Sequence, residues 1–140
     1  MILGTARLHG CMDIAVLGAG AVGSALGARL SRPASITLIG HDTRHLRALA
    51  ERPITVDGPG ESRNTQALSV TTEHRAVSEA DLVILTVKSY DTNTALEDIQ
   101  PYLDDTPILT VQNGLGNIEQ IRARVGPDQV IGGTTTMGAF

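Results

Sequence analysis

The glycine pattern at residues 18–23 constrains the fold more than any other feature of this sequence. It follows the apolar run at 14–17 directly and opens into a helix-like stretch at 24–30. This position between a strand pattern and a helix pattern is typical of a dinucleotide-binding turn, in which glycines permit the tight turn, a close approach to pyrophosphate and close helix packing. The predicted cofactor loop comprises Gly18, Ala19, Gly20, Ala21, Val22 and Gly23. The alternative is a small-residue packing turn that binds nothing.

Alternating strand and helix patterns along the rest of the chain predict an α/β fold. Strands are expected at 14–17, 36–39, 82–87, 107–112 and from 130, and helices at 24–30, from 42 or 43, from about 91 and from 117. With the glycine loop at the first crossover, this pattern indicates a Rossmann-type, doubly wound, mostly parallel sheet with flanking helices. Between 53 and 72 a turn cluster separates two short runs, 54–56 and 67–70, which are predicted to pair with each other.

Residues 12–140 are interpreted as one NAD(P)-binding domain, and residues 1–11, before the second methionine, as a leader that is a tag or a misassigned start. The net charge of −4 and the absence of Trp argue against a nucleic-acid partner. A single cysteine, Cys11, excludes a disulfide framework and favours a cytoplasmic location. The uncharged stretch 14–28 falls short of the ~20 residues of a membrane span. No metal site is predicted, because His41 and His45 lack a third ligand nearby.

Two polar residues follow predicted strands at the edge where open parallel sheets bind ligands. Lys88 ends the run 82–87, and Asn113 ends the run 107–112. Lys88 is interpreted as a cation that faces a phosphate or a substrate carboxylate, or else as a solvent-exposed strand end. Asn113 offers an amide donor and acceptor, or else serves a turn before Gly114.

The end of the second predicted strand bears on the choice of cofactor. A carboxylate about 20 residues past the glycines would bind the ribose 2′-hydroxyl of NAD, whereas basic groups accept the 2′-phosphate of NADP. Here Gly40 and His41 occupy that place, and Arg44 lies just beyond. Asp42 or Thr43 can cap the helix that follows, and Asp42 is better explained as a helix cap than as a ribose ligand. The pattern favours NADP over NAD.

The sequence resembles the ketopantoate reductase (2-dehydropantoate 2-reductase) family over residues 12–140. The resemblance rests on the segments 14–23, 87–92, 111–117 and 132–139. It implies an oxidoreductase of pantothenate and coenzyme A biosynthesis that reduces 2-dehydropantoate to (R)-pantoate with NADPH. It also implies that the loop 18–23 holds the pyrophosphate, that Lys88 and Asn113 line the cofactor and substrate cleft, and that backbone around Ala139 touches the cofactor. Family members often have an arginine where this chain has His41, so the 2′-phosphate is assigned to His41 or Arg44.

The family has a second, helical domain that supplies a catalytic lysine and a substrate-binding glutamate. Neither is expected within these 140 residues, so no catalytic residue is predicted in this chain, which should bind cofactor with little or no turnover alone. The expected partners are a small 2-keto acid and either a second copy or the missing C-terminal domain. One alternative is a free-standing nucleotide-sensing module without catalysis, and another is a two-domain dehydrogenase of a hydroxy acid or sugar phosphate.

Overall fold

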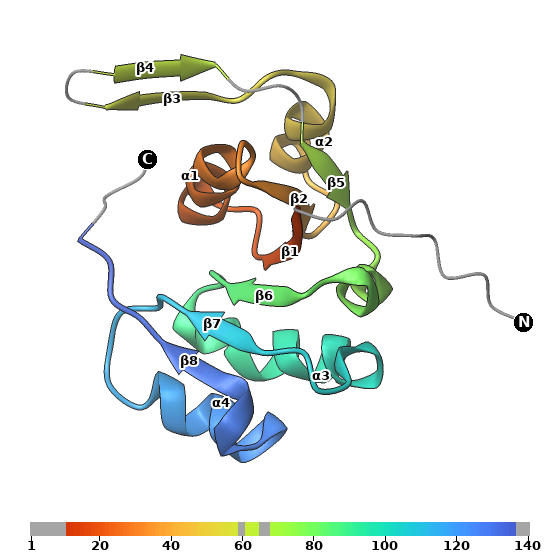
Figure 1. The fold of residues 1–140 in the computed structure, drawn as a ribbon, viewed down its shortest axis with the longest axis vertical. Helices are drawn as coiled ribbons and strands as arrows, with labels where there is room; N and C mark the ends of the chain where they lie inside the picture. The colour runs from red at the N-terminus through yellow and green to blue at the C-terminus, as the bar shows by residue number, and fades with distance from the viewer. Residues whose placement is uncertain (1–10, 59–60, 65–67, 137–140) are drawn as a thin grey trace, which may run out of the picture.

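A parallel β-sheet forms the centre of the computed structural model, which describes residues 11–58, 61–64 and 68–136. Its strands are β1 (Met12–Leu17), β2 (Ala34–Ile39), β5 (Ser69–Thr71), β6 (Leu82–Leu85), β7 (Ile108–Thr110) and β8 (Val130–Gly132). The strand order is β5-β2-β1-β6-β7-β8, and every adjacent pair is parallel (Figure 1). The chain winds outward from β1 in both directions, which is the order of a doubly wound nucleotide-binding sheet. The predicted Rossmann-type α/β fold is confirmed.

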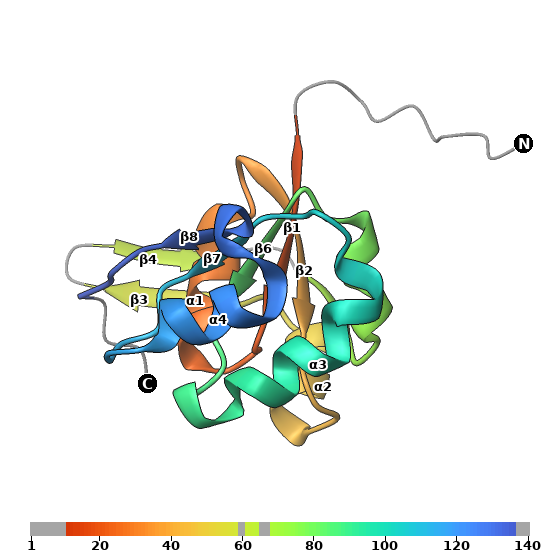
Figure 2. The same cartoon turned by 90° about the horizontal axis from the view of Figure 1, so that it is seen from below.

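Strand β1 shows why helices must cover both faces of this sheet. Ala15 and Leu17 belong to the core cluster under α3 (Thr92–Leu103) and α4 (Asn117–Val125). Ile14 and Val16 point the other way, into the cluster that includes side chains of α1 (Ala21–Leu30) and α2 (Arg44–Glu51). Figure 2 shows α3 and α4 together on one side of the strands. A strand between two helical layers is apolar on both faces, so a continuous apolar run is the expected sequence.

Short 3₁₀ segments complete the connections. They are η1 (His74–Glu79) between β5 and β6, η2 (Ser89–Asp91) before α3, and η3 (Pro127–Gln129) before β8. Val77 of η1 is buried in the core cluster that it shares with α3. At the start of α4, the N-cap is Gly116, whose φ is +86°, and Asn117 is the first helical residue. The helix predicted from residue 117 therefore begins there, and the Asn117 side chain turns back to donate to the Asn113 carbonyl of the preceding loop.

The segment between α2 and β6 differs from its predicted pairing. Strand β3 (Thr55–Gly58) pairs antiparallel with β4 (Glu61–Asn64), and the two form a separate hairpin that extends beyond α1 (Figure 1). Strand β5 instead joins the main sheet parallel to β2, with Val70 beside Leu38. The prediction that 54–56 pairs with 67–70 is wrong, because 55–58 pairs with the nearer segment 61–64 and 69–71 pairs with β2. The apolar Val70 is then free to pack on the core cluster of β1 and β2.

Some predicted features fall outside the described residues. These include Ala139 and, apart from the exposed Cys11, the leader predicted at 1–11. In the part of the chain that the structure describes, no helix combines the length and the apolar character needed to cross a membrane.

Candidate functional site

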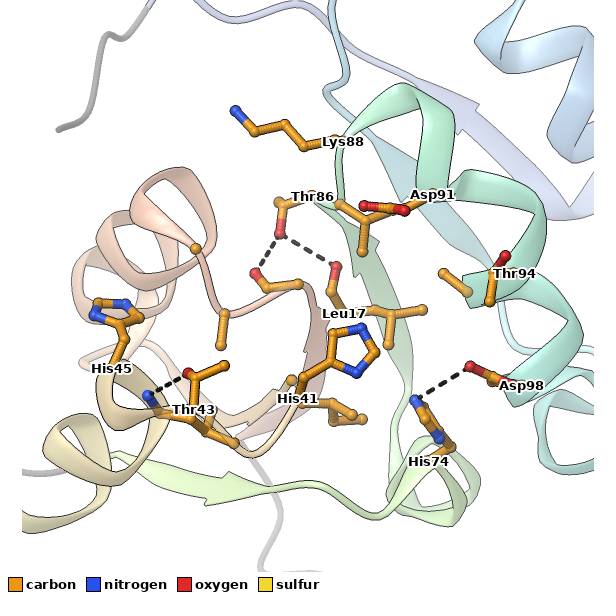
Figure 3. Close-up of a pocket in the computed structure, with 18 residues that line it drawn as sticks. Leu17, His41, Thr43, His45, His74, Thr86, Lys88, Asp91, Thr94 and Asp98 are labelled. Carbon is orange, nitrogen blue, oxygen red and sulfur yellow. Dashed lines mark hydrogen bonds and ion pairs between the residues drawn. The ribbon is translucent and has the colours of Figure 1, made fainter.

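A cavity of about 310 Å³ opens where β1, β2 and β6 end. The glycine loop, the β2–α2 connection, the end of β6, η1 and α3 all contribute to its lining (Figure 3). It lies between the two halves of the sheet, where the strand order reverses and where doubly wound folds bind their ligands. Its volume is at the lower end of the range for sites that take small molecules or cofactors.

Two of the three loop glycines are held by close packing. Gly18 has a φ of +112°, which favours glycine, and a Cβ on it would lie 2.7 Å from the Val87 nitrogen. Its N–H donates to the Ile39 carbonyl at 2.9 Å, which ties the loop to β2. A Cβ on Gly23 would collide with the Gly18 carbonyl oxygen. These two glycines therefore allow the turn and the close packing of α1 against the loop.

Gly20 has a different environment from its two neighbours in the motif. It is exposed, and a Cβ built on it would meet no described atom within 4 Å. It is also the N-cap of α1, whose first turn contains no acidic residue. The first N–H groups of a helix have no partner inside the helix, and the helix dipole adds partial positive charge there. The open space beside Gly20 is thus suited to an anion close to the backbone.

Thr86 fixes this loop from the opposite half of the sheet. Its hydroxyl lies 2.7 Å from the Gly18 carbonyl oxygen and 3.2 Å from the Leu17 carbonyl oxygen (Figure 3). Its backbone N–H also donates to Leu17 O at 2.9 Å. The residue after β6 therefore supports the turn after β1. Sequence reasoning treated Thr86 only as part of an apolar strand.

The end of β2 places one imidazole in the cavity and turns one carboxylate away from it. His41 lines the cavity and lies among its central side chains (Figure 3). Asp42 does not line it, because its two carboxylate oxygens each accept a hydrogen bond from Arg47 at 2.7 Å. This hydrogen bonding by Arg47 lowers the pKa of Asp42. The N-cap of α2 is Thr43, whose hydroxyl accepts the Leu46 N–H at 3.1 Å, so the interpretation of Asp42 as the cap is wrong.

Of the remaining predicted residues, one lines the cavity and two do not. Lys88, the only lysine in the sequence, is exposed and lines it. Arg44 begins α2, is exposed, and is absent from the lining. Asn113 is also outside the lining, on the loop after β7, but Ser89 donates a hydrogen bond to its carbonyl at 3.3 Å. The loops that carry Lys88 and Asn113 are therefore adjacent.

The far wall of the cavity contains residues that sequence reasoning missed. His74 Nε2 of η1 lies 3.8 Å from Asp98 Oδ2 of α3, and both residues line the cavity (Figure 3). His74 was missed because the segment before it was assigned to a hairpin. As β5 belongs to the main sheet, the residues after it arrive at the ligand-binding edge. Within residues 11–58, 61–64 and 68–136, no three His, Cys, Asp or Glu side chains are grouped to hold a metal ion.

Comparisons with known proteins agree with this architecture. The model of the ketopantoate reductase PanE/ApbA family matches residues 14–140. The chain is 39% identical over 129 residues to a 2-dehydropantoate 2-reductase of Halobacterium salinarum, covering 91% of this chain and 43% of the relative. It is 41% identical over 130 residues to the enzyme of the same name from Pyrococcus horikoshii, covering 91% of this chain and 41% of the relative. It therefore spans less than half the length of these relatives.

Solved structures show the same correspondence. A PanE/ApbA family ketopantoate reductase from Ralstonia eutropha superposes with a TM-score of 0.75 at 29% identity, over 86% of this chain and 40% of that one. A complex of D-mandelate dehydrogenase with NADH and anilino(oxo)acetate gives a TM-score of 0.76 at 27% identity, over 91% of this chain and 41% of that one.

Proposed function

Because this chain belongs to the ketopantoate reductase PanE/ApbA family, we propose that it is the NADPH-binding part of an enzyme that reduces 2-dehydropantoate to (R)-pantoate. One observation carries the proposal: the glycine loop is closely packed at Gly18 and Gly23 but open at Gly20, and it borders a cavity of about 310 Å³. A dinucleotide-binding turn needs this combination, because the pyrophosphate must approach the backbone beside the second glycine. The residues present therefore fit a nicotinamide dinucleotide.

In this proposal the backbone of residues 18–23 and the first turn of α1 hold the pyrophosphate. His41, with Arg44 nearby, receives the 2′-phosphate. The Asp42–Arg47 ion pair supports NADP over NAD, because the carboxylate that follows His41 in the chain already accepts two hydrogen bonds from a guanidinium. Arg44 would have to turn toward the cavity to contribute, whereas His41 already lines it.

When bound, the cofactor supplies a hydride to the keto carbon of the substrate. We assign to Lys88 the binding of a carboxylate or phosphate group, and to Asn113 an amide contact at the same end of the cleft. Ala139, proposed to touch the cofactor through its backbone, lies outside the described residues. Efficient transfer also needs a positioned proton donor. We assign that donor to a second, helical domain, because the curated relatives are more than twice as long as this match.

The first experiment is a calorimetric titration of the 140-residue chain with NADPH and, separately, with NADH. Tighter binding of NADPH supports the assignment of the 2′-phosphate to the β2 end. Preference for NADH contradicts the choice of NADP, and binding of neither contradicts a cofactor site that is complete in this chain.

A second experiment tests the reaction. This chain replaces the matching 43% of the Halobacterium salinarum enzyme, and NADPH oxidation is followed with 2-dehydropantoate. Turnover supports a reductase domain, whereas intact NADPH binding without turnover favours a nucleotide-sensing module. The likeness to D-mandelate dehydrogenase makes an aromatic 2-keto acid the second substrate candidate, and the same hybrid enzyme is assayed with one.

A further inference from the structure

Gln112 links the two loops that carry Lys88 and Asn113. Its side-chain Nε2 donates to the Val87 carbonyl at 2.7 Å and to the Thr92 hydroxyl at 2.9 Å. Val87 directly precedes Lys88, and Thr92 is the first residue of α3. One amide group on the β7 side therefore fixes both the start of the Lys88 loop and the helix that follows it.

The amide of Gln112 is itself held in one orientation. Its Oε1 accepts a hydrogen bond from the Thr110 hydroxyl at 3.2 Å, while its two Nε2 protons are used by Val87 and Thr92. The Thr92 and Thr110 side chains are buried, with residue exposures of 0% and 2%. The Thr110 hydroxyl also accepts from the Gln112 backbone N–H at 3.3 Å. An apolar side chain at 112 would therefore remove the amide partner of the buried Thr92 hydroxyl, and burying a polar group without its partner is costly.

The carbonyl of Asn113 accepts two further hydrogen bonds, one from the Lys88 loop and one from α4. The Ser89 hydroxyl donates to the Asn113 carbonyl at 3.3 Å, and Asn117 Nδ2 donates to that same carbonyl at 3.0 Å. Thus the residue before Lys88 is held by Gln112, and the residue after Lys88 holds Asn113. Both backbone segments are fixed, and the side chains of Lys88 and Asn113 take no part in these bonds.

We propose that Gln112 is a positioning residue that sets the Lys88 and Asn113 backbones relative to each other, and thereby the end of the cleft that receives the reacting groups. This inference rests on the proposed function for what the cleft binds. Gln112 acts through its neighbours, because its amide points to the Val87 carbonyl and the Thr92 hydroxyl rather than into the cavity.

The chain provides a matched control. Gln129 also donates through Nε2 to two backbone carbonyls, those of Asp104 at 2.8 Å and Thr106 at 3.1 Å. It connects η3 with the turn before β7, away from the cavity lining. Gln112→Met removes three side-chain hydrogen bonds and Gln129→Met removes two, each with little change in side-chain length. Both are expected to lower the melting temperature, Gln112→Met by somewhat more.

The sole lysine makes the local effect measurable. Protein labelled with ¹⁵N only in lysine has one backbone amide signal, that of Lys88. The Lys88 N–H belongs to the same peptide group as the Val87 carbonyl, which accepts the hydrogen bond from Gln112. Well below the melting temperature, Gln112→Met is expected to shift this signal, and Gln129→Met to leave it unchanged. NADPH affinity is expected to fall about fivefold in Gln112→Met alone, the effect of about one net hydrogen bond.

An unshifted Lys88 signal in Gln112→Met, or an equal shift in Gln129→Met, would overturn the proposal. So would a shifted signal with unchanged NADPH affinity, because Lys88 would then have moved without consequence for the cleft. If the unaltered chain binds no NADPH, the proposed function fails, and the amide signal alone decides whether Gln112 positions Lys88.

Discussion

Gly20→Val separates ligand binding from folding more cleanly than any other substitution in the glycine loop. Gly20 has φ −78° and ψ −165°, which side-chain-bearing residues adopt without strain. A Cβ there meets no described atom within 4 Å. The loss of a favourable helix cap is partly offset by a stiffer unfolded chain, so we expect a stability change within about 1 kcal/mol.

The effect on binding is expected to be much larger. A valine would occupy the space through which a pyrophosphate reaches the backbone. Hydrogen bonds from N–H groups to charged oxygens contribute about 1.5–3 kcal/mol each. The loss of two such hydrogen bonds corresponds to a decrease in NADPH affinity of about a hundredfold or more. Gly20→Ala, with a smaller side chain, should give an intermediate decrease.

The assay pairs calorimetric titration with thermal unfolding followed by circular dichroism. Gly23→Ala is the contrasting variant, because its Cβ would collide with the Gly18 carbonyl and lie 2.7 Å from Thr86 Oγ1. It should destabilise the fold by about 1–3 kcal/mol. NADPH affinity unchanged in Gly20→Val would refute the assignment of the pyrophosphate to this loop. If Gly20→Val destabilised the protein as much as Gly23→Ala, the conclusion that a side chain at residue 20 fits without a clash would be refuted.

Three further outcomes are expected. Replacing His41 and Arg44 together with alanine should weaken NADPH about tenfold or more and leave NADH nearly unchanged in titrations, because only NADPH carries the 2′-phosphate; equal losses would place that phosphate elsewhere. Thr86→Val should cost about 1–2 kcal/mol in chemical denaturation, because it keeps the shape but loses the hydroxyl beside Gly18 O; an unchanged free energy of unfolding would show that this hydroxyl does not support the turn. Thr43→Ala should cost about 1 kcal/mol through loss of the α2 cap, and Thr43→Ser should recover most of it.

The sequence predicted features that depend on local pattern and missed those that depend on distant pairing. The Gly18–Gly23 turn and the apolar strand before it are specified by neighbouring residues, so both were found. The partner of residues 69–71 was not, because joining β2 rather than β3 is decided by burial of Val70 against distant side chains. That error also concealed His74, which reaches the cavity only because β5 belongs to the main sheet.

At the end of β2, too, local sequence pointed to a residue that lines the cavity but assigned the wrong role to its neighbour. His41 was singled out by its distance from the glycines and lines the cavity, while its contact with a cofactor stays a prediction. Asp42 was misread because a carboxylate before a helix is compatible with a cap and with an ion pair. Asp42 pairs with Arg47 because the guanidinium offers two donors in one plane, and Thr43 caps the helix instead.

The anchoring of the glycine loop has a consequence for how fast and by what route a ligand can enter. The loop bonds to the end of β2 through Gly18 and to the residue after β6 through Thr86. Its conformational entropy is therefore lost during folding rather than at the moment of association. Binding of a dinucleotide to such a rigid turn should give a single kinetic phase in stopped-flow fluorescence. Its observed rate constant should rise linearly with ligand concentration, and no slower phase from a conformational rearrangement should follow.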